Sequence, residues 1–155
     1  MGIGDTVIFL PFIKALSKKF NSPISILVKE NSKANQYLHQ TKYIDKILTL
    51  ERDNKTNNRH GGFFGIFKLA NDLKKYKFDK VFIFNSSLRF NLIAKISGIP
   101  QIYQYPLFAK NKQHIIEAPK KFLKENLNLD INEDPEVQID NYSIWNKALT
   151  QSEIQ

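Results

Sequence analysis

Several features that many proteins use are missing from this sequence, and each absence excludes a class of site or of protein. The 155 residues contain no cysteine, which rules out disulfides, thiolate metal sites and cysteine nucleophiles. The longest apolar runs, such as residues 7–13, are far shorter than the roughly 20 residues that span a bilayer. The first residues also lack the basic segment and the small-residue cleavage site of a signal peptide. The sequence therefore predicts a cytoplasmic protein.

Nucleotide-cofactor, nucleic-acid and metal motifs are missing as well. Gly2 and Gly4 form a G-x-G pair, but the dinucleotide fingerprint needs a further glycine where Val7 stands, which argues against a nicotinamide-dependent enzyme. No run of basic residues alternates with stacking aromatics, so we expect no nucleic-acid partner. His39 and His114 have no partner at metal-ligand spacing, and we expect no metal site.

Acidic residues are outnumbered by basic ones, and the excess suggests an anionic partner. The 23 Lys and Arg against 15 Asp and Glu give a formal charge of +8. Such a charge suits a phosphorylated substrate or an anionic lipid surface. The alternative is a solvated basic face with no dedicated partner. Apolar residues make up 42% of the chain, which suits one globular domain.

Helical and strand patterns alternate along the chain and predict an α/β fold. We expect main helices over 6–20, 63–76, 88–97 and 118–127, and strands over 24–28, 44–50, 80–84 and 99–105. Three weaker segments complete the pattern: a short helix capped by Asn31 or Ser32 and reaching His39, an extended piece over 135–139, and a polar helix over 141–155. Strands that alternate with helices indicate a Rossmann-like, doubly wound parallel sheet with helices on both faces.

Loop, cap and aromatic positions complete this prediction. Residues 51–62 contain no expected core residue and predict a mobile loop that ends at two glycines. We expect Asn85, Ser86 or Ser87 to cap the helix that follows, and Gly98 to end it in the left-handed conformation. A set of aromatic residues is expected in the core: Phe63, Phe64, Phe67, Phe82 and Phe84.

The first residues raise the question of a missing strand. In doubly wound sheets the first strand lies at the centre and leads into a glycine-rich turn. Here Gly2-Ile3-Gly4-Asp5 stands in the position of that turn, with no strand before it. We therefore expect a sequence truncated at its start and a sheet without its first, central strand, which leaves two edges with unpaired backbone groups.

A series of spaced motifs runs from residue 2 to about residue 130. Its members are Gly2-x-Gly4-Asp5, Val7, Pro11, Leu16, Phe20, Pro23, Ile26, Val28, residues 43–47, Tyr76-x-Phe78-Asp79-Lys80-Val81, Ser86-Ser87-x-Arg89 and Ile96-x-Gly98-Ile99-Pro100. In order and spacing the series resembles the N-terminal half of the ADP-heptose lipopolysaccharide heptosyltransferases, glycosyltransferase family 9. The resemblance implies a GT-B architecture, in which two Rossmann-like domains face each other across a cleft. Residues 1–140 would be the N-terminal acceptor domain and 141–155 the start of the interdomain connector, with the C-terminal nucleotide-sugar domain absent.

The resemblance also implies an activity and a set of partners. Family members transfer a sugar, with inversion, from a nucleotide sugar to the lipopolysaccharide core, without a metal or other cofactor. This implies an ADP-sugar donor bound by the missing domain, an inner-core acceptor bound by this chain, and peripheral contact with the inner membrane. The fragment alone is expected to be inactive. The alternative is a stand-alone α/β binding module for a phosphorylated or anionic ligand, without catalysis.

The first helix carries the candidate catalytic residue. By resemblance, Asp5 matches the aspartate regarded as the catalytic base, a role that suits a carboxylate because inverting transfer needs a group to accept the proton of the attacking hydroxyl. The residues alone favour Asp5 as the cap of the first helix, and with the resemblance both roles stay open. The backbone amides of Gly4, Asp5 and Thr6 are candidates for binding an anionic group of a substrate.

Two further segments carry candidate acceptor contacts. Arg52, Lys55, Arg59 and His60 resemble the family's basic acceptor-binding loop, and guanidinium groups bind phosphates and carboxylates well. The alternative is a solvated loop. Ser87 and Arg89 follow the strand over 80–84, at the sheet edge that faces the cleft in α/β folds. The alternative for Arg89 is a surface arginine paired with an acid.

Overall fold

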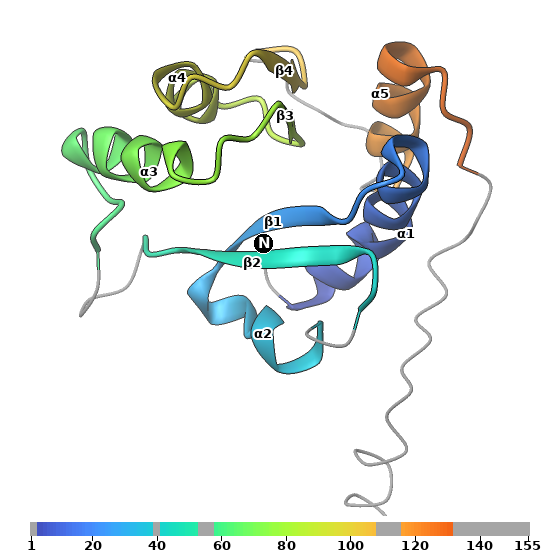
Figure 1. Cartoon of the computed structure of the whole chain (residues 1–155), viewed down its shortest axis with the longest axis horizontal. Helices are drawn as coiled ribbons and strands as arrows, with labels where there is room; N and C mark the ends of the chain where they lie inside the picture. Colours follow the sequence, from blue (N-terminus) through green and yellow to red (C-terminus); the bar gives the residue numbers. More distant parts are fainter. Residues whose placement is uncertain (1–2, 39–40, 53–57, 108–115, 132–155) are drawn as a thin grey trace, which may run out of the picture.

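The computed structural model describes residues 3–38, 41–52, 58–107 and 116–131, whose elements form an α/β/α arrangement (Figure 1). The strands β1 (Ile24–Lys29) and β2 (Ile44–Leu50) pair in parallel, and so do β3 (Lys80–Ile83) and β4 (Gln101–Gln104). Parallel pairing requires a crossover between the paired strands, which the intervening helices supply. The predicted parallel α/β fold is confirmed.

One face of the strands is covered by α1 (Ile3–Phe20) and α5 (Glu117–Leu127). Phe12 and Leu16 of α1 and Leu123 of α5 are almost completely buried there. Ile26 of β1 and Phe82 of β3 pack against the same cluster. This layer therefore contacts strands of both pairs.

The opposite face is covered by α3 (Phe64–Lys74) and α4 (Leu88–Ile96). Leu69 of α3 packs with Leu50 of β2 and Leu27 of β1, and Ala94 of α4 packs with Ile83 of β3. Leu27 and Ile83 are the immediate neighbours of the residues that face α1 and α5, as expected where successive strand side chains point to opposite faces. The predicted doubly wound arrangement, with helices on both faces, is therefore confirmed.

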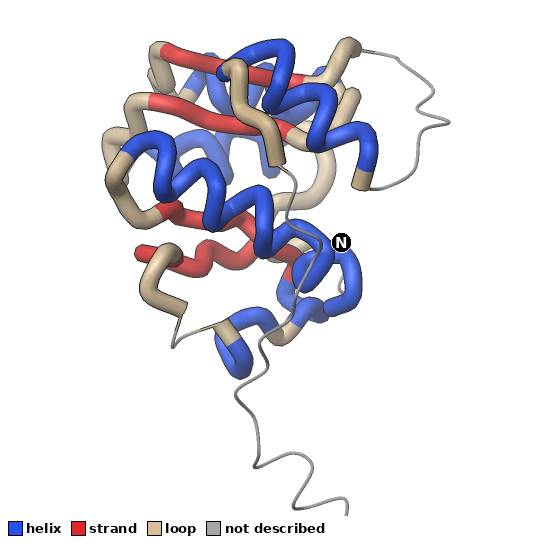
Figure 2. The backbone as a smooth tube through the Cα atoms, turned by 90° about the vertical axis from the view of Figure 1, so that its right-hand side faces the viewer, coloured by secondary structure: helices blue, strands red, loops and turns tan. Residues whose placement is uncertain are grey.

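The two strand pairs form separate sheets within the part of the chain that the structure describes. Figure 1 shows β1 and β3 as the inner strands of the two pairs, and Figure 2 shows one pair above the other between the helices. Because both pairs share the same helical layers, they are arranged as two parts of one sheet.

The observed elements differ from the predicted ones mainly at their ends. α1 begins at Ile3, three residues earlier than expected. The predicted short helix is divided into a 3-10 turn, η1 (Glu30–Ser32), and α2 (Ala34–Tyr37), with Lys33 between them at φ 49°. Lys33, not Asn31 or Ser32, occupies the N-cap position of α2. The Ser32 hydroxyl nevertheless accepts the amide hydrogen of Ala34, the first residue of α2, at 3.4 Å, so the predicted capping role of Ser32 is partly confirmed. The segments expected over 135–139 and 141–155 lie outside the described residues.

The two ends of α4 can be compared with the predicted cap at its start and the predicted glycine at its end. Gly98 follows the helix with φ 77°, as predicted for a left-handed terminator. Ser87 occupies the N-cap position, as predicted, but its side chain makes no capping bond. Instead, the Ser87 amide donates to the Asn85 side-chain oxygen at 2.7 Å, which turns the chain before the helix begins.

Candidate functional site

The predicted site residues belong to segments at the carboxyl ends of the strands. Residues 58–62 lie between β2 and α3, and Ser87 and Arg89 lie where β3 gives way to α4. α1 leads into the start of β1 and also contacts η1, which follows the end of β1. Its first turn therefore lies toward the same edge. In open α/β sheets this edge binds ligands.

His60 is buried, so the expectation that residues 51–62 contain no core residue is wrong. Only 3% of its surface is exposed. Its Nδ1 accepts the Glu51 amide hydrogen at 3.0 Å, and its own amide donates to the Glu51 carbonyl at 2.9 Å. Because Nδ1 is an acceptor, Nε2 carries the proton and donates to Asp72 Oδ2 at 3.2 Å. His60 thus fastens the loop to the end of β2 and to α3, with both ring nitrogens engaged.

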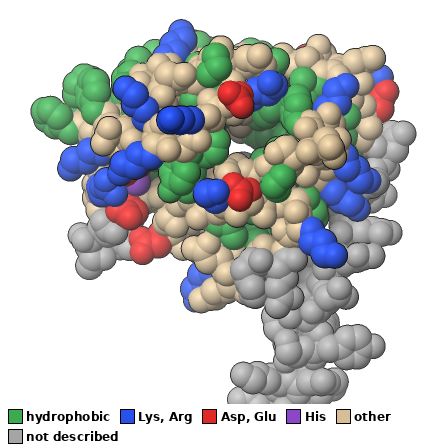
Figure 3. All heavy atoms as spheres, in the orientation of Figure 1, with side chains coloured by type: hydrophobic (Ala, Val, Ile, Leu, Met, Phe, Trp, Pro, Cys, Tyr) green, Lys and Arg blue, Asp and Glu red, His purple; other side chains and the backbone are tan. Residues whose placement is uncertain are grey.

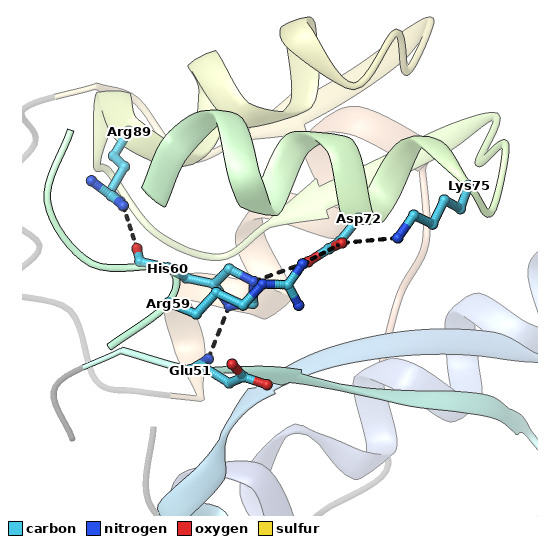
Figure 4. A network of polar contacts seen from close by, with 6 residues as sticks. All are labelled: Glu51, Arg59, His60, Asp72, Lys75 and Arg89. Atoms are coloured by element: carbon cyan, nitrogen blue, oxygen red, sulfur yellow. Dashed lines mark hydrogen bonds and ion pairs between the residues drawn. The ribbon is translucent and has the colours of Figure 1, made fainter. Parts of the chain in front are cut away.

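The carboxylate of Asp72 binds His60 and the basic side chains near it (Figure 4). Its carboxylate accepts from Arg59 Nη2 at 2.8 Å and from Lys75 Nζ at 3.1 Å, in addition to His60. Burial opposes the charged form of this carboxyl, but the contacts with His60, Lys75 and Arg59 outweigh it and hold the pKa of Asp72 below its ordinary value. The sequence interpretation did not include Asp72, because no local motif links it to a loop more than ten residues away.

Arg89 joins the start of α4 to the same loop. Its Nη2 donates to the His60 carbonyl at 2.6 Å and its Nη1 to the Gly62 carbonyl at 2.8 Å. A planar guanidinium can hold two acceptors in this way because its donors form a fixed fork. The structure therefore brings Arg59, His60 and Arg89 together from two distant segments, as Figure 4 shows.

Ser87 belongs to a neighbouring polar cluster. Its backbone carbonyl accepts from Gln104 Nε2 at 2.9 Å, and the same amide nitrogen donates to the Asn85 carbonyl at 2.8 Å. Gln104 ends β4, and Asn91 of α4 donates to its Oε1 at 2.8 Å. This cluster fixes the turn between β3 and α4, and with it the position of Arg89.

Gly4, Asp5 and Thr6 all lie in the first turns of α1. Asp5 is the third residue of the helix and not the residue before it, so the alternative that Asp5 is the N-cap is wrong. The first amides of a helix have no acceptor within it, and those of Gly4 and Asp5 are among them. Thr6 is buried, which turns its side chain toward the core.

The contacts of His60 and Asp72 limit the part that these two side chains can take in proton transfer. Among the described residues, the neutral His60 uses both nitrogens and Asp72 is held by three partners, which leaves neither as a general base in this arrangement. Within the described ranges, no cluster of three or more His, Asp or Glu side chains could hold a metal ion. A search of the same residues finds no helix long and apolar enough to span a membrane.

Comparison with known proteins supplies one match, to a solved structure. No family model and no curated protein matches the chain. The chain is similar to a glycosyl transferase family 9 protein from Veillonella parvula DSM 2008, with a TM-score of 0.69 and 18% sequence identity. The two share a fold. The match covers 97% of this chain and 45% of the other, so the chain spans less than half of that protein's length.

Proposed function

We propose that this chain is the acceptor-binding half of a glycosyltransferase that transfers a sugar from a nucleotide-sugar donor to the lipopolysaccharide core. The observation that carries the proposal is the fold match to a glycosyl transferase family 9 protein over nearly the whole chain. The ordered motifs that the sequence shares with this family support it. The length of the match supports a donor domain outside the chain, with residues 1–140 as the acceptor domain and 141–155 as the start of a connector.

The proposed chemistry is inverting transfer without a metal, and Asp5 is the proposed base. In this reaction a carboxylate takes the proton from the acceptor hydroxyl while the sugar develops oxocarbenium character. The position of Asp5 in the first turn of α1, toward the carboxyl edge, supports the assignment. The free amides of Gly4 and Asp5 would bind an anionic group beside it.

The acceptor would lie over the edge formed by the loop at Arg59 and His60 and the turn at Ser87 and Arg89. Phosphates and carboxylates of the inner core match its basic character. In this proposal His60 and Arg89 act chiefly by holding the loop, since their side chains already bind protein groups. The setting is the cytoplasmic face of the inner membrane, with peripheral contact.

Two measurements test the proposal. Calorimetric titration of the 155-residue chain with phosphorylated inner-core oligosaccharide should show binding that the dephosphorylated form lacks. In protein expressed from the natural coding region, Asp5→Asn should reduce transfer from an ADP-sugar by at least about 100-fold and leave acceptor binding intact. Asp79→Asn is the matched control, because Asp79 precedes β3 at the opposite edge. Acceptor binding without transfer would favour the stand-alone binding module.

A further inference from the structure

The start of α3 exposes three aromatic side chains that the sequence pattern assigns to the core. Phe63, Phe64 and Phe67, which we call the aromatic patch, are 67%, 76% and 47% exposed. Their rings contact one another, with centroids 6.0 Å apart for Phe63 and Phe64 and 5.6 Å apart for Phe63 and Phe67. Fully burying a phenylalanine side chain stabilises a protein by about 1.5–3 kcal/mol, and these partly exposed rings forgo a large share of it. Exposed apolar patches of this kind commonly mark an interaction surface.

The patch lies beside a second exposed apolar row. The Gly62 carbonyl, directly before Phe63, is bound by Arg89, so the start of α4 lies next to the start of α3. α4 exposes Leu88, Leu92 and Ile96, which are four residues apart and therefore share one side of the helix. The aromatic patch therefore lies near the start of the helix that carries this aliphatic row.

The segment that carries these apolar groups is strongly basic. Residues 58–97 contain eight Lys and Arg and only two Asp, a formal charge of +6 that makes up most of the charge of the whole chain. Of the two acids, Asp72 is already held by Arg59 and Lys75. Figure 3 shows hydrophobic side chains protruding at the left of the molecule, where α3 begins, with Lys and Arg side chains next to them.

We propose that the aromatic patch docks this chain on an anionic lipid bilayer. Aromatic and aliphatic side chains that enter the headgroup region, together with nearby basic side chains that bind anionic lipids, are the elements of interfacial binding. Single-stranded nucleic acid suits this surface less well, because the aliphatic row of α4 offers no ring on which bases stack. The patch would hold the protein on the membrane surface and bring the carboxyl edge close to a lipid-borne acceptor.

The identity of the membrane rests on the proposed function, but docking itself is measured without any sugar. The chain is mixed with sucrose-loaded vesicles of phosphatidylcholine alone or of phosphatidylcholine and phosphatidylglycerol at 3:1, and sedimented. We expect binding to the anionic vesicles that falls with added salt. The double variant Phe63→Ser, Phe64→Ser should weaken it by about tenfold or more, and Lys68→Glu by severalfold. Leu107→Ser, which removes an exposed apolar residue after β4, should leave binding unchanged.

Thermal unfolding of each variant separates docking from folding, and the double variant should retain the melting temperature because both rings are exposed. Absence of wild-type binding to the anionic vesicles overturns the proposal, as does equal binding by the double variant. Binding of a single-stranded oligonucleotide that is lost in the double variant, with no vesicle binding, assigns the patch to nucleic acid instead. Vesicle binding without sugar transfer supports docking and counts only against the proposed function.

Discussion

The two helical layers use their phenylalanines in opposite ways. In the layer of α1 and α5, Phe9, Phe12 and Phe122 are buried against the strands. In the layer of α3 and α4, three phenylalanines at the start of α3 are exposed, and the loop before them is fixed by polar contacts of His60 and Arg89. The layer of α1 and α5, the buried layer, is thus stabilised mainly by apolar burial. The layer of α3 and α4, the open layer, is held at the start of α3 by hydrogen bonds, and the rings there remain exposed.

The largest effect should come from truncating a ring in the buried layer. Phe12→Ala should lower the free energy of unfolding by about 3–5 kcal/mol, because it removes a ring that is 2% exposed and leaves a cavity. Phe64→Ala, the matched change in the open layer, should stay within about 0.5 kcal/mol of the wild type. Urea denaturation measures both. Similar losses for the two variants would contradict the contrast between the layers.

A glycine in the open layer should be the next most sensitive position. Gly65 is buried in the first turn of α3, and a methyl group there would meet the backbone carbonyl of His60. Gly65→Ala should therefore cost about 1–3 kcal/mol, since the obstacle is backbone that cannot simply rotate away. Gly62→Ala separates sterics from conformation, because Gly62 has open space but a φ of 59°. An unchanged free energy of unfolding in Gly65→Ala would show that the His60 carbonyl does not obstruct a methyl group at this position.

Removing the shared carboxylate tests the polar anchor directly. Asp72→Ala should cost about 1–2 kcal/mol, because the buried Nε2–H of His60 loses its acceptor. Asp72→Asn keeps an acceptor and should cost less. Lys46→Ala, which breaks only the exposed pair with Asp45, is the control and should change stability by less than about 0.5 kcal/mol.

The same carboxylate predicts a dependence of stability on pH. Its pKa is lower in the folded chain than the ordinary value of about 3.9, so its contribution is fully present above that value. The contribution is lost as pH falls from about 4 through the lowered pKa. The stability gap between wild type and Asp72→Asn should therefore narrow in acid, as urea titrations at successive pH values would show. A gap that widens in acid would contradict the assignment.

The smallest effect should come from a polar atom inside the buried layer. The Tyr105 hydroxyl is buried without a hydrogen-bond partner among the described residues, and burial raises the pKa of Tyr105. Tyr105→Phe should be neutral or stabilise the fold by up to about 1 kcal/mol, because it removes an unsatisfied group and keeps the ring contact with Phe122. A clear loss on thermal unfolding would reveal a partner for the hydroxyl.

The regular elements could be predicted from the sequence, and the site contacts largely could not. The run over β2 is strongly patterned, and its predicted bounds match the structure. Periodicity placed Phe67 on a helix but could not show that its side of the helix is uncovered. His60 was named as a candidate site residue, but its contact with Asp72 could not be predicted, because it depends on how a loop folds back on a helix. Arg89 was rightly placed at the carboxyl edge, yet its acceptors are carbonyls with no sequence signature.

The paired hydrogen bonds between Glu51 and His60 have a consequence for how such a protein can diversify. They close the loop at its base, so the eight residues from 52 to 59 are bounded by fixed points. Doubling the length of a flexible loop adds only about 0.6 kcal/mol of closure entropy. Lengthening the chain between these two fixed points should therefore cost the rest of the fold little, provided that Arg59 keeps its ion pair with Asp72. Segments inserted between Glu51 and His60 could therefore change which ligand the protein binds, while the helices and strands stay as they are.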